Sequence, residues 1–399
     1  MKRYIFTILI AAFVFLGFVG QSSADLTVTN EVMSVWGTKR VVMFDIALDT
    51  SYPAGGETLT KGSRRMAAVD QVIIPPKNGY TFEYDETNEK VKVFASAPAI
   101  VYEEQQTIAT AAVTLNYPAA YIIAVAQANA NIAITDTGAT LAANQCKPTA
   151  ALAVGTRTGL TFHAGLSGVV YVTYVTQAWK EVWDNLVQSE VVTVTSNVGE
   201  MANRSVGIQS IRVSSSSGTT LNAMLMLDKD DTVATSEVEV DWSPAGDSGT
   251  TTELTFYAAE ATAATVTYIK KPTSGFLYDN LVEEETATLT AVGEGNLQHL
   301  QYPVLMWSYA GQIPINGQTT QAIINERGTA GTAEAYMFWT EGSGVTQFGA
   351  AITNQATAVS TATYIKGRPQ DIPFLIPLEV RNAQNLSALT GVQVIMIGR

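Results

Sequence analysis

Residues suited to acid–base, thiol or metal chemistry are scarce in this chain. Its 399 residues include two histidines, His163 and His299, and one cysteine, Cys146. One cysteine cannot form a disulfide within the chain, and neither histidine has a second histidine or a cysteine close by to complete a zinc site. The nucleophile-elbow, phosphate-loop and dinucleotide-binding glycine motifs are also missing. We therefore expect no catalytic residues, no cofactor, no bound metal and no enzymatic activity.

Charged residues are also few, and they are mostly acidic. Charged side chains make up 15% of the chain, and the formal net charge is −13. Because nucleic acids are bound through clustered Lys and Arg, nucleic acid is not an expected partner. Much of the 47% hydrophobic content is Ala and Val, with many Thr beside them. This composition is typical of a β-rich protein with weakly charged surfaces, which suit lateral packing in an assembly. The alternative is that the surface merely keeps the chain soluble.

Residues 1–24 form a hydrophobic segment with the pattern of a secretory signal peptide. Lys2 and Arg3 are followed by an apolar run over 4–19 and by small or polar residues up to Ala24. This pattern predicts cleavage before Asp25. The run is short for a permanent membrane span. A retained anchor and a buried hydrophobic arm remain as alternatives.

Residues 36–94 contain the clearest strand signals. Tyr80, Phe82 and Tyr84 alternate with polar residues, so the three aromatic side chains share one face of a predicted strand. A polar turn follows, and residues 90–93 alternate again as the returning strand. No residue type is arranged here for catalysis, so we interpret the stretch as scaffold.

The same stretch carries a family resemblance. Residues 49–59 (D-T-S-Y-P-A-G-G-E-T-L), a hydrophobic run over 69–76 and residues 79–85 (G-Y-T-F-E-Y-D) resemble a group of β-rich structural proteins of tailed bacteriophages. Chains in that group tend to close on a Leu-Ser/Thr-Gly-Val-x-Val strand that ends in Gly and a basic residue. Residues 386–399 (L-S-A-L-T-G-V-Q-V-I-M-I-G-R) match this ending.

The resemblance covers about 26–98 and 385–399, so the long middle of the chain lies outside it. It implies a virion structural protein that assembles with copies of itself and with other virion proteins. Such proteins assemble in the cytoplasm without a signal peptide, which conflicts with the pattern of residues 1–24.

The middle of the chain contains an internal repeat. Residues 160–164 (L-T-F-H-A) recur as 254–258 (L-T-F-Y-A), and 172–175 (V-T-Y-V) recur as 266–269 (V-T-Y-I). Residues 184–187 and 279–282 are both D-N-L-V, and 362–366 (A-T-Y-I-K) give a fainter third copy. The near-constant spacing of about 94 residues predicts tandem units of one fold.

Many short strands with turns between them predict an all-β fold of tandem β-sandwich or jelly-roll-like modules. Residues 107–115 are predicted as one strand, and the connection 179–187 as a helical turn or two. We place the modules at 25–118 (completed by 385–399, where strand 392–397 returns to the N-terminal strands), 119–215, 216–310 and 311–399.

Several acidic positions suggest a binding or catalytic site, but each has a simpler structural interpretation. Residues 228–231 (D-K-D-D) lack the spacing of an EF-hand loop and are predicted as a solvated turn. Glu237 and Glu239 are either solvent-facing strand residues, which we favour, or half of a glycosidase pair. The run 283–285 (E-E-E) is predicted as a solvated face.

The remaining positions are expected to pack rather than to bind. Trp179 and Trp183 lie four residues apart, so they form either an aromatic binding patch or, as we favour, core contacts. His163 stands where the repeat places Tyr257, which indicates an aromatic packing position or a strand-edge position, not a catalytic one.

The sequence therefore predicts a non-enzymatic structural protein of a phage particle, either a capsid decoration or cement protein or a fibre or tail component. The alternative is an exported bacterial cell-surface protein, such as a surface-layer, filament or adhesin subunit, that is secreted after cleavage near Ala24. A carbohydrate-active sandwich enzyme would need carboxylates or histidines that only the fold brings together.

Overall fold

The computed structural model describes residues 26–127, 130–214, 220–221, 225–227, 233, 237–241, 249–257, 261–288, 294–296, 301–308, 322–324, 334–338, 347–350, 359–366, 372, 375–380 and 384–399. Residues 1–24, 228–231 and His299 lie outside these ranges. The described chain is built from strands, mostly in antiparallel sheets, which confirms the all-β prediction. Its contacts divide into two compact units. Unit 1 comprises the described residues up to Ala95 together with Glu379–Arg399, and unit 2 is Ser96–Leu378.

Unit 1 is a pair of sheets closed by a strand from the far end of the sequence. The first sheet has the order β1-β2-β31-β4, and the second has the order β3-β6-β30 with β5 beside β6. As the sequence predicts, β31 returns to the N-terminal strands and pairs with both β2 and β4. A single 3₁₀ turn, η1 (Gly62–Arg64), precedes β4. The strands are β1 (Thr27–Trp36), β2 (Lys39–Ala47), β3 (Glu57–Thr58), β4 (Val69–Ile73), β5 (Thr81–Asp85), β6 (Lys90–Ala95), β30 (Leu378–Glu379) and β31 (Val392–Gly398).

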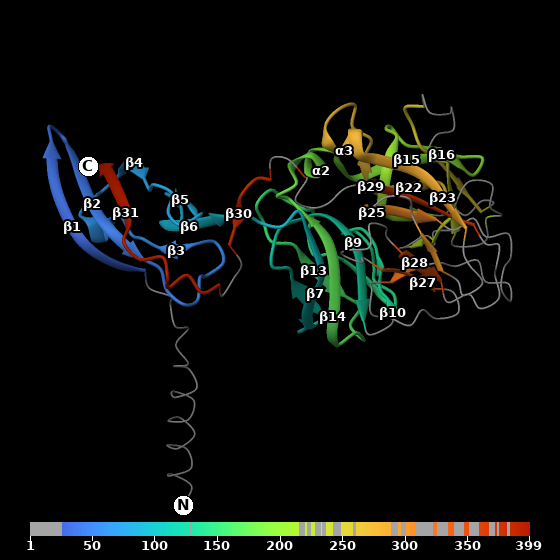
Figure 1. Cartoon of the computed structure of the whole chain (residues 1–399), viewed down its shortest axis with the longest axis horizontal. Helices are drawn as coiled ribbons and strands as arrows, with labels where there is room; N and C mark the ends of the chain where they lie inside the picture. The colour runs from blue at the N-terminus through green and yellow to red at the C-terminus, as the bar shows by residue number, and fades with distance from the viewer. Residues whose placement is uncertain are drawn as a thin grey trace, which may run out of the picture. The chain divides into compact units, whose positions relative to one another are not determined.

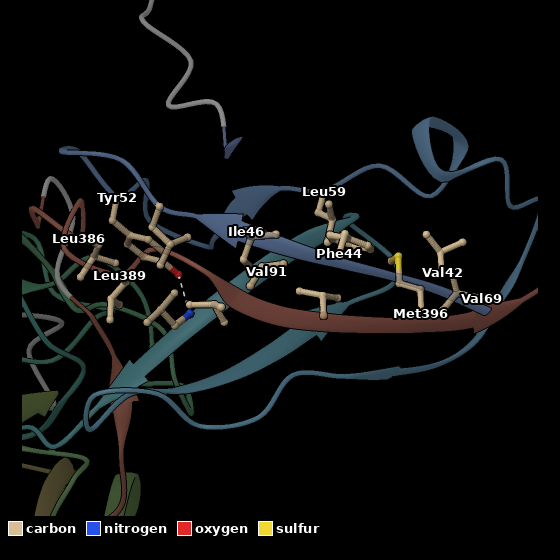
Figure 2. Packing of buried hydrophobic residues seen from close by; sticks show 14 of the residues in the cluster. Val42, Phe44, Ile46, Tyr52, Leu59, Val69, Val91, Leu386, Leu389 and Met396 are labelled. Atoms are coloured by element: carbon tan, nitrogen blue, oxygen red, sulfur yellow. Dashed lines mark hydrogen bonds between the residues drawn. The ribbon is translucent and has the colours of Figure 1, made fainter. Parts of the chain in front are cut away.

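The core of unit 1 lies between these two sheets (Figure 2). Val42, Phe44 and Ile46 alternate along β2 and are fully or almost fully buried. Tyr80, Phe82 and Tyr84 pack against this core from one face, as their alternation predicts. Tyr52 is buried and links three segments: its hydroxyl accepts a hydrogen bond from the Val93 amide (3.1 Å) and donates to Glu379 Oε1 (2.8 Å). The tyrosine of the D-T-S-Y-P motif therefore holds the two ends of the sequence together.

Two glycines lie in the segments that resemble phage structural proteins, and each is needed because another part of the backbone comes very close to it. Gly56 has φ 101°, and a Cβ there would lie 2.7 Å from the carbonyl oxygen of Val91. At Gly398 a Cβ would lie 2.1 Å from the carbonyl oxygen of Ala68. Since real Cβ atoms do not approach oxygen so closely, both positions exclude any larger residue. The glycines in these two motifs are thus explained by packing.

Unit 2 contains three modules that repeat one topology (Figure 1). In each module, one sheet has the last strand of the module between the first and third strands. The fifth, sixth, seventh and second strands follow one another in that order in modules 1 and 2. They form a separate sheet in module 1, whereas in module 2 the pairing of the first and second strands joins them to the first sheet. The fifth and sixth strands of these modules pair in parallel, and the equivalent pair of module 3 is parallel too.

The strands of each module follow one another in the chain. Module 1 consists of β7 (Ile100–Ile108), β8 (Ala112–Thr114), β9 (Ala119–Gln127), β10 (Ala130–Asn131), β11 (Ala133–Ile134), β12 (Gln145–Pro148), β13 (Gly159–Phe162) and β14 (Gly168–Thr176). Module 2 consists of β15 (Leu186–Thr195), β16 (Val198–Glu200), β17 (Ser205–Ser214), β18 (Thr220–Leu221), β19 (Leu225–Leu227), β20 (Glu237–Asp241), β21 (Glu253–Phe256) and β22 (Ala263–Lys270). The described strands of module 3 are β23 (Leu281–Thr288), β24 (Glu294–Asn296), β25 (Gln301–Ser308), β26 (Ala322–Ile324), β27 (Glu334–Phe338), β28 (Gln347–Ala350) and β29 (Val359–Lys366).

The two sheets of a module face each other across an apolar core. In module 1, Val172 of β14 and Ile122 of β9 share one cluster with Leu160 of β13 and Cys146 of β12. In module 2, Val266 and Ile208 share another with Leu254 and Val238. Modules 1 and 2 therefore have the two facing layers of a β-sandwich. The short helices α2 (Lys180–Asp184) and α3 (Phe276–Asn280) lie between successive modules, and α2 is the helical turn predicted for the connection 179–187.

The module limits differ from those predicted. The contacts place the first limit between Ala95 and Ser96, and the sheet pairing places the other two at α2 and α3, whereas the sequence predicts limits at residues 118, 215 and 310. The prediction of one strand over 107–115 is wrong. Thr110 and Ala111 adopt φ of 50° and 57°, which turns the chain between β7 and β8 and moves it to the other sheet.

Candidate functional site: the junction of the three modules

A hydrogen bond between a tyrosine and a glutamate recurs in all three modules. Tyr174 of β14 donates to Glu104 Oε2 of β7 at 2.6 Å. The equivalent bonds run from Tyr268 to Glu190 and from Tyr364 to Glu285. All three tyrosines are fully buried, and each lies on the last strand of its module, between the first and third strands. The pair therefore ties the first strand of every module to its last one.

A backbone irregularity places each glutamate. The register between the first and last strands shifts just before the glutamate in every module. In modules 1 and 2 the shifted residues Glu103 and Ser189 have φ of 44° and 54°, and their amides donate to Thr173 and Thr267 at 3.1 Å. Such a bulge rotates the following side chain toward the partner strand. The glutamate is thus aimed inward by the fold of the strand.

Each glutamate of modules 1 and 2 also accepts a hydrogen bond from a loop amide. Glu104 Oε1 accepts from the Asn116 amide at 2.8 Å, and Glu190 Oε1 accepts from the Ala202 amide at 2.7 Å. Burial, and then the neighbouring carboxylate, raises the pKa of Tyr174 well above its usual value. Because the phenol keeps its proton, it serves as a fixed donor and not as a base. The arrangement supports cohesion between strands, not proton transfer.

The residue after each tyrosine points into a cluster that all three modules share. Val175, Ile269 and Ile365 follow Tyr174, Tyr268 and Tyr364, and all three are buried in it. We call it the junction cluster, and its buried members are Ala99, Ile100, Ala120, Tyr121, Val175, Trp179, Val182, Val206, Ile269, Leu277, Ile365 and Ile372. The same alternation of the strand therefore sends the tyrosine toward its own module and the next residue toward the other modules.

The two helices belong to this junction and contact each other (Figure 1). Trp179, which precedes α2, packs edge-on against Phe276 of α3 with ring centroids 6.2 Å apart. Both carboxylate oxygens of Glu181 accept a hydrogen bond from the Leu277 amide at 2.9 Å, which satisfies a free amide at the start of α3. Burial raises the pKa of Glu181.

Polar contacts reinforce the interface between modules 1 and 2. Gln209 of β17 accepts a hydrogen bond from the Ile122 amide of β9 at 2.9 Å. Arg212 forms an ion pair with Asp136, whose side chain is almost completely buried. The side chain of Gln188 exchanges two hydrogen bonds with the backbone of Leu152, at 2.8 and 3.0 Å. Contacts also join β17 with β25 and β26 with β9 and β10, so each module touches both others.

Trp179 and Trp183 pack in the core as the sequence predicts, whereas His163 and Tyr257 are half-buried and exposed respectively, each just after a strand. Trp179 is buried, and Trp183 packs against the junction cluster from its rim. His163 is half-buried after β13, and its Nδ1 accepts a hydrogen bond from the Gly165 amide at 3.2 Å. Tyr257, its counterpart, follows β21 in the same way.

Cys146 is a core residue of module 1. Its side chain is fully buried opposite Phe162, as Val238 is opposite Phe256 in module 2. Burial raises the pKa of the thiol, so it stays protonated and unreactive.

The prediction that residues 283–285 form a solvated face is wrong. Glu283 bridges Arg204 (2.9 Å) and Lys271 (2.5 Å), and Glu285 is the partner of Tyr364. The run lies on β23, where the irregular register aims Glu285 at β29, while Glu283 reaches Arg204 and Lys271 of module 2. The signal was present in the repeat: D-N-L-V at 184–187 and 279–282 is followed in both copies by two residues and a glutamate.

The remaining carboxylates lie on a strand of module 2 and around a cavity of unit 1. Glu239 lies half-buried on β20, opposite Thr255 of β21. A cavity of about 280 Å³ lies in unit 1, lined by Val72, Phe82, Asp70, Glu83 and other residues of β4 and β5. The acidic side chains lining it are exposed, whereas a general acid needs a desolvated carboxyl group.

Within the described ranges, no three His, Cys, Asp or Glu side chains gather closely enough to hold a metal ion. In that part of the chain there is also no helix with the length and apolarity needed to cross a membrane. Comparisons with protein-family models, with curated proteins and with solved structures gave no match.

Proposed function

We propose that this chain is a non-enzymatic structural protein of a phage particle, as a capsid decoration or cement protein or as a fibre or tail component. The observation that carries the proposal is the arrangement of three modules of like topology around one junction cluster. Their repeated Tyr–Glu bonds, capped helix and buried ion pair serve cohesion. Such a body is suited to bearing load and to presenting repeated surfaces to neighbours.

Unit 1 supports the same proposal by a separate route. The motifs that resemble phage structural proteins are the ones that close this unit: Tyr52 bridges β6 and Glu379, and Gly56 and Gly398 allow close strand contact. The residues that carry the resemblance are therefore the ones that join the strands of unit 1, and they are not isolated surface residues.

The second candidate is an exported bacterial cell-surface protein, such as a surface-layer, filament or adhesin subunit. The sequence of residues 1–24 favours it, because its basic start, apolar run and small residues match a cleavable signal. Both candidates share a structural role and differ in where the protein is found.

The test is the intact mass of the protein from its native source, combined with fractionation of particles and cell envelopes. We expect the mass of the chain from Met1 or Lys2, in particles banded by density. A mass that starts at Asp25, with the protein in the envelope fraction, would replace the phage role by the cell-surface role. A protein that is found in neither particles nor envelopes, but soluble and unassembled, would contradict a structural role altogether.

A further inference from the structure

β1 is an edge strand whose second half is apolar on both faces. Among the described strands it pairs only with β2, so its other edge is open (Figure 1). Val32, Met33, Val35 and Trp36 are all exposed, Val35 by 64% and Trp36 by 70%. An open, apolar edge strand pairs readily with another strand, and soluble proteins usually protect such an edge with charge or cover. This segment has no charged residue between Val32 and Trp36.

The outer face of the sheet continues the apolar surface. The register places Val32 beside Met43, Met43 beside Ile395, and Ile395 beside Ile73. These four residues form one row across all four strands, and Met43 and Ile73 are also exposed. The apolar edge of β1 is therefore the border of a wider apolar face.

The order of residues on β1 matches a second copy of itself. Residues 32–36 read Val-Met-Ser-Val-Trp, with an apolar pair on each side of Ser34. If two such strands pair antiparallel about Ser34, Val32 lies opposite Trp36 of the other copy, and Met33 lies opposite Val35. Both are apolar cross-strand pairs, and the aromatic with β-branched combination is a favourable one.

The flanking positions agree with this register. Glu31 would lie opposite Gly37, so no like charges meet across the strands. A bulge between Thr29 and Val32 ends the regular part of β1 at Val32, which limits the new pairing to the apolar segment. The net charge of −13 disfavours association elsewhere, whereas this segment is neutral.

We propose that residues 32–36 of β1 pair antiparallel with the same residues of a second copy of this chain, about a twofold axis at Ser34, and so join two first sheets into one. The inference deepens the proposed structural role, because it names the contact through which copies associate. Such an isologous contact is closed and leaves the modules of unit 2 available for other neighbours.

Cysteine cross-linking tests the register. Opposed residues of an antiparallel pair have Cα atoms about 4.5–5.5 Å apart, which suits a disulfide. Cys146 is buried, so an introduced cysteine is the accessible thiol. We expect full-length Ser34→Cys to form an intermolecular disulfide at least ten times faster than Thr29→Cys under mild oxidation. The two copies of position 29 would be roughly 30 Å apart in this register, so Thr29→Cys is the matched control on the same exposed strand.

Sedimentation of Val35→Lys gives a second measurement. Val35 is exposed, so the variant keeps the fold, and a lysine placed at the edge opposes pairing. We expect a dimer for the natural chain and a monomer for Val35→Lys, while Val154→Lys, at an equally exposed position in unit 2, stays dimeric. A monomeric natural chain, equal cross-linking at positions 29 and 34, or dimers only after removal of residues 1–24 would each overturn the proposal.

The two proposals fail separately. If Ser34→Cys does not cross-link but the protein is still found in particles, this contact is wrong and the structural role stands. If it cross-links but the protein is absent from particles and envelopes, the contact stands and the structural role is wrong.

Discussion

Modules 1 and 2 keep the same Tyr–Glu bond but bury its acceptor to different depths. Tyr174 and Tyr268 are both fully buried, whereas Glu104 is 7% exposed and Glu190 is half-buried. The loops around the pair differ too: Tyr268 accepts a hydrogen bond from the side chain of Asn203, and Tyr174 accepts one from the Tyr117 amide. Strand register therefore fixes the pair itself, while the surrounding loops vary and set how much the bond contributes.

The largest effect is expected at the junction cluster, which belongs to no single module. Trp179→Ala removes a buried ring that contacts Phe276, and we expect it to lower the free energy of unfolding by about 3–5 kcal/mol. Urea unfolding followed by circular dichroism measures this change. Val191→Ala, at an exposed position of β15, is the control and should change stability by less than about 0.5 kcal/mol. A loss below about 1 kcal/mol for Trp179→Ala would mean that the modules do not depend on the junction.

The Tyr–Glu pairs should show the difference between the modules directly. Tyr174→Phe leaves the buried carboxylate of Glu104 without its donor, so we expect a loss of about 1–3 kcal/mol. Tyr268→Phe should cost less, because the half-buried Glu190 can be hydrated. The same unfolding experiment compares the two variants, with Tyr257→Phe at an exposed position as the control. Equal losses of stability would show that the burial of the glutamate does not affect how much the hydrogen bond contributes.

Alkaline pH should weaken the fold through the same tyrosines. Burial raises the pKa of Tyr174 and of Tyr268 above the ordinary value near 10. The unfolded chain then loses these protons above pH 10 while the folded chain keeps them. The stabilisation is complete below pH 10 and falls above it, by about 1.4 kcal/mol per pH unit for each such tyrosine.

Urea unfolding between pH 9 and pH 11 measures this slope. Tyr174→Phe should make it shallower, whereas Tyr257→Phe should leave it unchanged. A slope that Tyr174→Phe does not alter would show that this phenol ionises equally easily in both states.

The smallest effect is expected at Cys146, where the modules already differ. Val238 occupies the equivalent core position in module 2, so Cys146→Val should change stability by less than about 1.5 kcal/mol. The native thiol should react with a thiol reagent only after unfolding, since burial raises its pKa. Rapid labelling of the folded protein would contradict a core role for Cys146.

Local patterns in the sequence were sufficient to predict much of the fold. Alternation located β5 and β6, the resemblance to phage structural proteins located β31, and the repeated T-Y pair located β14, β22 and β29. The limits of the modules could not be predicted as well. The repeat gives the distance between equivalent residues, but it does not show at which residue one module ends. The break between β7 and β8 depends on positive φ at Thr110 and Ala111, residues that carry no turn signal.

The Tyr–Glu pairs were missed for a different reason. Glu104 and Tyr174 are 70 residues apart, and their meeting depends on the pairing of the first and last strands. In module 3 the partner glutamate is the last of three successive acids, which resemble a solvated surface in any local window. Only an alignment of whole repeats would reveal the shared position.

The place of β31 in its sheet sets an order on how the protein is made. β31 lies between β2 and β4, yet it follows every residue of unit 2 in the chain. During synthesis, β2 and β4 must wait for their central partner until the ribosome has completed all three modules. A polypeptide that stops short of β31 leaves both strands open and exposes apolar surface to proteolysis. The first sheet of unit 1 can therefore be completed only after the ribosome has translated the whole of unit 2.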